Sequence, residues 1–163
     1  MQKLKIAILS YRSAPFGGGQ GIYIHDISKA LSLMGHQVDV ISGPPYPNLS
    51  EKINLIKLPG LDLFQTFSFK DRLKIFIKKK NKRAIDFYEF FSTFFGGFPE
   101  MRTFGERAKE FLDENHHYDI VIDNQSVSYG MLKIQKKFPL LEIIHHPITK
   151  DYKFELQLNS GFM

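Results

Sequence analysis

The feature that most constrains the fold is a short apolar run, followed by glycines and then by helical periodicity. Residues 4–9 are apolar except for Lys5, which predicts a strand buried on both faces, as in a parallel sheet. Glycine occupies four of the five positions 17–21, and without a Cβ the backbone can approach a neighbour closely. A helix is predicted over residues 22–34, where apolar side chains recur at helical spacing: Ile24, Ile27, Leu31 and Met34.

The glycine-rich turn is a candidate binding loop. It leads into a helix N-terminus, where unpaired N–H groups and the positive end of the helix dipole favour a phosphate or another electron-rich group. A flexible surface loop is the alternative. The candidate residues are Gly17, Gly18, Gly19, Gln20 and Gly21.

Two common phosphate-binding motifs do not fit this loop. The chain has no Gly-Lys-Ser/Thr, and the dinucleotide fingerprint fails because Ile22 or Ile24 stands where its third glycine should be. The second predicted strand also ends in Ser42 instead of the acid typical of NAD sites. A nicotinamide-dependent oxidoreductase is therefore disfavoured.

Composition narrows the class of protein further. The 163 residues suit one domain, and the chain has no cysteine, hence no disulfide or thiolate metal site. The absence of cysteine is compatible with a reducing cytoplasm. The sequence shows no signal-peptide pattern and no apolar run of transmembrane length. The net charge is +5, with much of the excess in residues 78–83. That basic run lacks interleaved aromatics, so nucleic-acid binding is not expected.

The rest of the chain alternates between short apolar runs and helical patterns. Further strands are predicted at residues 37–42, 53–58, 120–123 and 140–144, and helices at 99–114, 127–136 and from 152 onward. This alternation predicts an α/β fold with a doubly wound, Rossmann-like parallel sheet and helices on both faces.

The middle of the chain contains an aromatic stripe at helical spacing, broken by Gly96 and Gly97. We expect the stripe to pack on the sheet, as apolar helix faces usually do. A membrane-facing or acceptor-contacting helix is the alternative, because the basic run comes directly before it. The stripe consists of Ala84, Phe87, Tyr88, Phe91, Phe94 and Phe95, with Phe90 and Phe98 at its margin.

Polar residues follow two of the predicted strands, where open α/β sheets bind their ligands. One group is Asp123, Asn124 and Gln125, which could instead cap a helix or form a turn. The other is His145 and His146, which could instead be structural. Adjacent side chains in extended backbone point opposite ways, so the two histidines are not expected to share a metal ion.

Together, these motifs resemble family 4 glycosyltransferases. The resemblance rests on the order of a strand, a Gly-Gly loop, a long helix and the Gly-His-x-Val-x-Val pattern at residues 35–40. It continues through residues 97–104, 123–125 and 145–151. The similarity covers nearly the whole chain but only the N-terminal half of such an enzyme. Residues 1–163 are thus expected to form one Rossmann-like, acceptor-side domain of a GT-B architecture, without the C-terminal donor-binding domain.

The resemblance also implies an activity. Family 4 enzymes move a sugar, with retention of configuration, from a nucleotide sugar to a sugar or lipid-linked acceptor, and need no metal or other cofactor. It implies that His145 contacts the donor sugar, with His146 as the alternative, and that the glycine loop approaches the donor phosphate or the acceptor. The isolated fragment is expected to be inactive. A stand-alone, non-catalytic binding or scaffolding domain is the competing hypothesis.

The expected location is the cytoplasm. Peripheral contact with the inner membrane face, through residues 73–98, stays open as part of the alternative interpretation of the aromatic stripe.

Overall fold

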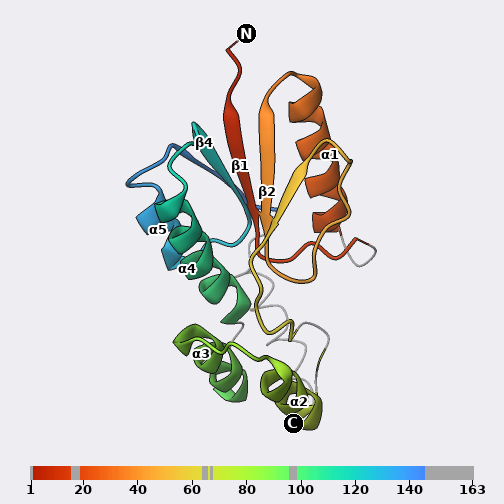
Figure 1. Cartoon of the computed structure of the whole chain (residues 1–163), viewed down its shortest axis with the longest axis vertical. Helices are drawn as coiled ribbons and strands as arrows, with labels where there is room; N and C mark the ends of the chain where they lie inside the picture. The colour runs from red at the N-terminus through yellow and green to blue at the C-terminus, as the bar shows by residue number, and fades with distance from the viewer. Residues whose placement is uncertain (1, 16–18, 64–65, 67, 96–98, 146–163) are drawn as a thin grey trace, which may run out of the picture.

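The described residues form one parallel sheet of five strands in the order β3-β2-β1-β4-β5. The computed structural model describes residues 2–15, 19–63, 66, 68–95 and 99–145. All strands run in the same direction, so their C-terminal ends share one edge, which we call the carboxyl edge (Figure 1). The strands are β1 (Lys5–Ser10), β2 (Gln37–Ser42), β3 (Asn54–Lys57), β4 (Ile120–Asn124) and β5 (Leu140–Ile143).

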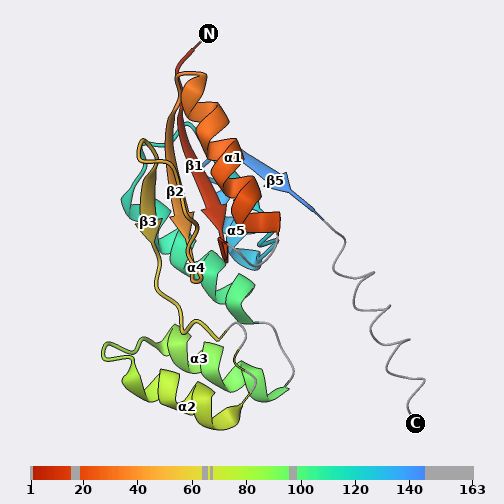
Figure 2. The ribbon, with the colours of Figure 1, turned by 90° about the vertical axis from the view of Figure 1, so that its right-hand side faces the viewer.

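Helices cover both faces of the sheet, which confirms the predicted Rossmann-like fold. One face carries α1 (Gly19–Leu33), and the other carries α4 (Pro99–Glu114) and α5 (Tyr129–Ile134) (Figures 1 and 2). Successive strand residues point to opposite faces, so Ile6 and Ile8 pack toward α1, whereas Ala7 and Leu9 pack toward α4. Apolar side chains on both faces explain why β1 is a nearly continuous apolar run.

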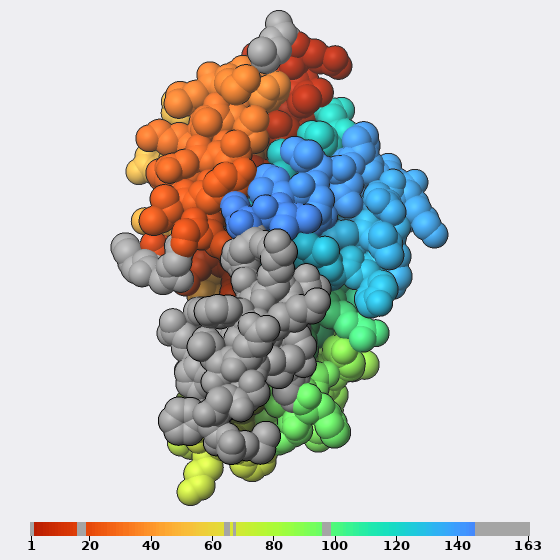
Figure 3. Space-filling model, turned by 180° about the vertical axis from the view of Figure 1, so that it is seen from behind, coloured from red at the N-terminus to blue at the C-terminus, as the bar shows by residue number. Residues whose placement is uncertain are grey.

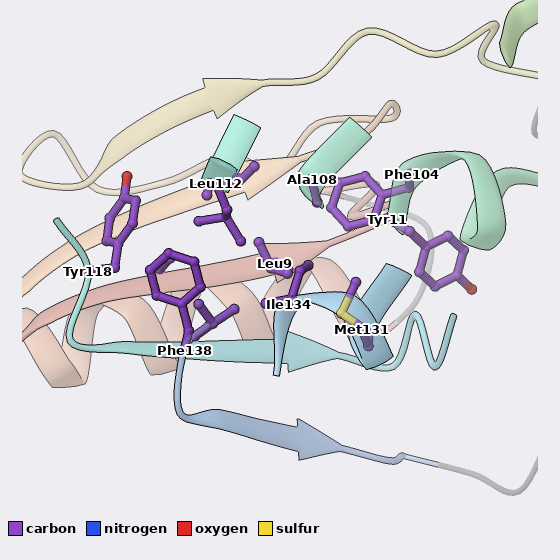
Figure 4. Packing of buried hydrophobic residues seen from close by; sticks show 12 residues of the cluster. Leu9, Tyr11, Phe104, Ala108, Leu112, Tyr118, Met131, Ile134 and Phe138 are labelled. Carbon is purple, nitrogen blue, oxygen red and sulfur yellow. The ribbon is translucent and has the colours of Figure 1, made fainter. Parts of the chain in front are cut away.

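The core under α4 and α5 is the larger of the two. Figure 4 shows Leu9 of β1 surrounded by side chains from both helices and from the segments that flank β4 and β5. Its labelled members include Tyr11, Phe104, Ala108, Leu112, Tyr118, Met131, Ile134 and Phe138.

The first helix begins earlier than its apolar periodicity predicts. It starts at Gly19, so Gly19 and Gly21 lie in its first turn and not in a loop. It ends at Leu33, before Gly35, whose φ of 92° is the left-handed conformation that often follows a helix. Ile24 is buried on the sheet, whereas Met34 is exposed.

Two helices stand beyond the carboxyl edge as a separate helical hairpin (Figures 1 and 2). They are α2 (Phe69–Lys78) and α3 (Ala84–Ser92), and a 3₁₀ turn at Thr93–Phe95 follows α3. The hairpin has a small core of its own, made by Leu61, Leu63, Phe90, Leu73, Ile75 and Phe76. None of the helices within the described ranges is long and apolar enough to cross a membrane.

The prediction that the aromatic stripe packs on the sheet is wrong. Phe87, Phe91 and Phe94 are about half exposed, at 45%, 54% and 49%, and Phe95 is 88% exposed. The buried side of α3 instead contains Asp86, Glu89 and Phe90. Gly96, Gly97 and Phe98 lie outside the described residues.

A buried arginine explains why two carboxylates of α3 turn inward. Arg107 of α4 donates to Asp86 at 2.7 Å and to Glu89 at 2.6 Å, while Lys79 Nζ lies 2.6 Å from Asp86. We call these four residues the arginine cluster. Glu89 also accepts a hydrogen bond from the Leu61 N–H, at 2.9 Å. Because buried charges are stable only when paired, this cluster orients α3 and leaves its aromatic stripe outside.

Candidate active site

Asp123 is the fully buried residue that shapes the loop after β4. Its carboxylate accepts hydrogen bonds from the Ser126 N–H at 2.9 Å, the Ser126 hydroxyl at 2.6 Å and the Val127 N–H at 3.1 Å. These bonds form a turn, one of the alternatives that the sequence left open. In this structure Asp123 therefore holds the loop in place, and its role in binding stays a prediction.

The loop that Asp123 holds has an unusual backbone. Gln125 has a φ of 61° and Val127 a φ of 40°, in the left-handed region that residues with a Cβ rarely adopt. Valine is β-branched, so its conformation is the more strained of the two. Such strain persists only when surrounding contacts fix it, and it is concentrated at functional sites.

The structure brings His145 together with Asn124 and Gln125. The His145 N–H donates to Gln125 Oε1 at 3.1 Å, and His145 Nε2 lies 2.7 Å from Asn124 Oδ1. An amide oxygen only accepts, so Nε2 carries the proton, and a neutral ring keeps Nδ1 as an acceptor. The predicted convergence at the carboxyl edge thus holds for these three residues, while His146 lies outside the described residues.

The first helix contributes to the same site through Tyr23, which the sequence did not point to. Its ring meets the His145 ring edge-on, with centroids 4.7 Å apart. Seen from behind, the blue surface of β5 lies beside the orange surface of α1 (Figure 3). Tyr23 follows the glycines by two positions, so the contact links the first turns of α1 to the histidine.

The glycines of the candidate loop have different surroundings. A Cβ on Gly21 would lie 2.4 Å from the Ala14 carbonyl oxygen, so Gly21 permits a close approach within the protein itself. A Cβ on Gly19 would meet nothing within 4 Å, which leaves space at the N-terminus of α1. Gln20 is half-buried, and Gly17 and Gly18 lie outside the described residues.

Glu142 is a second residue that sequence reasoning missed. It stands opposite Asp123 in the β4–β5 register. Burial, a hydrogen bond with Asp123 and the charge of Asp123 raise the pKa of Glu142 to about 9. Its Oε1 is buried with no hydrogen-bond partner among the described residues, as is Asn124 Nδ2. The sequence contains a signal for this pair, because Asp123 and Glu142 occupy matching positions of β4 and β5. The signal can be recognised only when these two strands are known to be neighbours.

A cavity of about 630 Å³ lies along the flank of α5 and β5. Its lining combines apolar side chains with Arg102, Ser126, Ser128 and Glu142. The Arg102 guanidinium lies 5.0 Å from the ring centre of Tyr88, and Arg102 also donates to the Tyr88 hydroxyl at 3.0 Å. Within the described ranges, no three His, Cys, Asp or Glu side chains are grouped to hold a metal ion.

Comparison with known proteins gives the family. Residues 17–162 match Glycosyltransferase Family 4. Over 156 residues the chain is 42% identical to an "MMP alpha-(1->4)-mannosyltransferase" of Mycolicibacterium hassiacum. The alignment covers 94% of this chain but only 37% of that relative. The match extends over most of the sequence and agrees with the fold, so the chain belongs to glycosyltransferase family 4.

Proposed function

We propose that this chain is the N-terminal, acceptor-side half of a retaining glycosyltransferase. The whole protein would transfer a hexose, with mannose as the first candidate, from a nucleotide sugar to a hydroxyl of an acceptor. Family membership, the Rossmann-like half and the mannosyltransferase relative support this proposal. The relative is much longer than the aligned region, so we expect the donor-binding residues to lie in a further domain.

The proposed reaction exchanges one bond at the anomeric carbon of the sugar for another. The bond from that carbon to the donor phosphate oxygen breaks, and a bond to the acceptor oxygen forms with the same configuration. The leaving phosphate carries away the bonding electron pair, and its oxygen takes up the proton that the acceptor hydroxyl loses. No metal ion takes part in the reaction as proposed.

His145 is the residue on which the proposal depends most. Its backbone is fixed by Gln125 and its ring by Asn124 and Tyr23. With Nε2 bonded to Asn124, the Nδ1 atom of a neutral ring can accept a hydrogen bond from a sugar hydroxyl. A ring held in advance loses little freedom when the sugar binds, which favours precise positioning of the anomeric carbon.

The N-terminus of α1 has a second role in the proposal. Its first N–H groups have no partner within the helix and carry the positive end of the dipole. Space at Gly19 would let a donor phosphate or the acceptor approach these groups. There they would stabilise the negative charge that develops on the leaving phosphate.

The test uses the full-length protein and a set of nucleotide sugars, with mannose donors first. His145→Ala should lower kcat/KM at least about a hundredfold, comparable to removing one preorganised contact to the transition state. His116→Ala is the matched control, because His116 stacks on Phe138 in the loop before β4, at the opposite edge of the sheet. Its activity should match that of the native protein.

Three results would contradict parts of this proposal. Full activity of His145→Ala together with loss of activity in His146→Ala would move the donor contact by one residue. No transfer by the full-length protein with any donor would favour the non-catalytic binding domain. Turnover by residues 1–163 alone would show that the second domain is unnecessary.

A further inference from the structure

We propose that the helical hairpin docks on an anionic lipid surface. Aromatic and aliphatic side chains on its outer side lie among lysines, and no described segment of the protein covers them. The outer surface is formed by Phe69 and Ile77 of α2, by Phe87 and Phe91 of α3, and by Phe94 of the 3₁₀ turn that follows α3. This inference does not depend on the proposed sugar transfer.

Helix α3 has two sides of opposite character. Asp86 and Glu89 face α4 and bind Arg107, so that side is fixed and buried. Phe87, Phe91 and Phe94 follow one another at spacings of four and three residues and therefore share a stripe. Each of them is close to half exposed, so the stripe faces outward, next to α2.

Ring contacts join the outward sides of the two helices into one surface. The ring centre of Phe69 of α2 lies 5.6 Å from that of Phe94 in the 3₁₀ turn, and the ring centre of Phe76 lies 5.1 Å from that of Phe87. Phe91 and Phe94 are 6.1 Å apart. Because these aromatics support one another, the apolar surface is an ordered patch and not a set of isolated side chains.

The surroundings of this patch are strongly basic. Residues 69–83 contain eight Lys or Arg and one Asp. Lys70 and Lys74 are exposed on α2 at helical spacing with Ile77. Lys82 Nζ lies 5.3 Å from the centre of the Phe76 ring, and Lys78 and Lys80 are exposed at the end of α2.

The combination of exposed aromatic rings and lysines fits an anionic membrane surface better than a second copy of this chain. Basic residues near a membrane are attracted to acidic lipids, and aromatic rings insert at the level of the head groups. Two copies of the hairpin facing each other would bring like charges together, which opposes association. Contact with a further domain or with a saccharide acceptor would account for the aromatic side chains. It would not account for the many lysines around them.

The position of the hairpin determines which side of the domain would face the membrane. It lies beyond the carboxyl edge of the sheet (Figure 2), and the arginine cluster attaches it to α4. A hairpin on the bilayer would therefore place the carboxyl edge, with His145, on the membrane side of the domain.

The test is co-sedimentation of the full-length protein with vesicles that contain neither donor nor acceptor. Vesicles of phosphatidylcholine alone are compared with vesicles containing about a third phosphatidylserine, each at low and at high salt. We expect binding to the anionic vesicles only, and weaker binding at high salt, because salt screens the lysines.

Two double variants locate the binding surface. Lys70→Glu/Lys74→Glu should weaken binding to anionic vesicles at least about tenfold, because reversing two charges removes their attraction. Phe91→Ser/Phe94→Ser should weaken the binding that remains at high salt. The matched controls are Lys29→Glu/Lys136→Glu and Leu33→Ser, which change exposed residues elsewhere and should bind as the native protein does.

The inference is wrong if the native protein does not bind anionic vesicles at low salt. It is also wrong if the hairpin variants and their controls bind equally. In either case, native protein that sediments as a dimer, with the Phe91→Ser/Phe94→Ser variant monomeric, would assign the surface to a second copy. All four lysine positions are exposed, so the charge variants should fold normally, which circular dichroism would check.

Discussion

The arginine cluster and the loop after β4 beside His145 both contain buried polar side chains, but they differ in how fully these are paired. Around Arg107, each carboxylate has a cationic partner within 2.7 Å, and Glu89 also binds a backbone N–H. At the carboxyl edge, Asn124 Nδ2 and Glu142 Oε1 are buried without a partner among the described residues, and two nearby residues have left-handed backbone.

The difference suggests a division of roles. A paired charge network fixes two elements relative to each other, because breaking it leaves a charge buried alone. Burial alone would raise the pKa of Asp86, yet hydrogen bonds from the Arg83 N–H, Lys79 and Arg107 outweigh it and lower that pKa. The strained and partly unpaired cluster is where a ligand can still form bonds.

The largest effect should come from breaking the paired network. Arg107→Ala should cost about 3–5 kcal/mol of folding free energy, since it leaves Glu89 buried without a cationic partner and Asp86 with Lys79 alone. Hydrogen exchange should show the loss locally, as faster exchange in α3. The measurement is chemical denaturation of the full-length protein, followed by exchange mass spectrometry.

The control for this prediction is another arginine of the same region. Arg83 pairs with Glu110, but both side chains are about half exposed, so Arg83→Ala should cost about 1 kcal/mol or less. Equal costs for the two variants would mean that the buried network does not hold the hairpin. Complete pairing of buried charges would then not distinguish the arginine cluster from the polar cluster at the carboxyl edge.

The glycines after β1 allow a second test with a smaller effect. Gly21→Ala places a Cβ against the Ala14 carbonyl oxygen, and such overpacking costs about 1–3 kcal/mol. Gly19→Ala has free space and should leave stability nearly unchanged while lowering activity if the donor or acceptor approaches there. Thermal unfolding and kinetics of the two variants separate these roles; equal destabilisation would contradict the assignment.

Much of the sheet could be predicted because its signals are local. Each strand contains neighbouring or alternating apolar residues, and the order of strands and helices implies the parallel arrangement. The meeting of His145 with Asn124 and Gln125 followed from topology, since both segments end neighbouring strands. The contact with Tyr23 did not follow, because it depends on how α1 lies across the sheet.

The orientation of α3 could not be predicted from periodicity. Its aromatic stripe is the more apolar side, and without a partner that side would be buried. The deciding residue, Arg107, lies 21 residues from Asp86 and 18 from Glu89, on another helix. A helical pattern contains no information on such a distant charge, so the sequence favoured the wrong side.

The last prediction concerns how stability changes with pH at the carboxyl pair beside the site. Glu142 has a pKa of about 9 in the folded protein, against an ordinary value of 4.5. Between pH 4.5 and about pH 9, the Glu142 carboxyl is protonated in the folded protein and ionised in the unfolded chain. Its contribution to stability is therefore complete below about pH 4.5 and is lost as the pH rises to about 9.

Glu142→Gln removes this titration and keeps a donor for Asp123. The melting temperature of the variant, relative to the native protein, should therefore increase from pH 5 to pH 9, by about 2–4 °C for each kcal/mol involved. Glu114→Gln, at an exposed position of α4, should leave the native pH dependence unchanged. If native and Glu142→Gln curves run parallel, Glu142 is ionised when folded, and the pairing with Asp123 is wrong. A rising difference would instead show that the sheet beside His145 carries an acid in its neutral form, unlike the ionised carboxylates around Arg107.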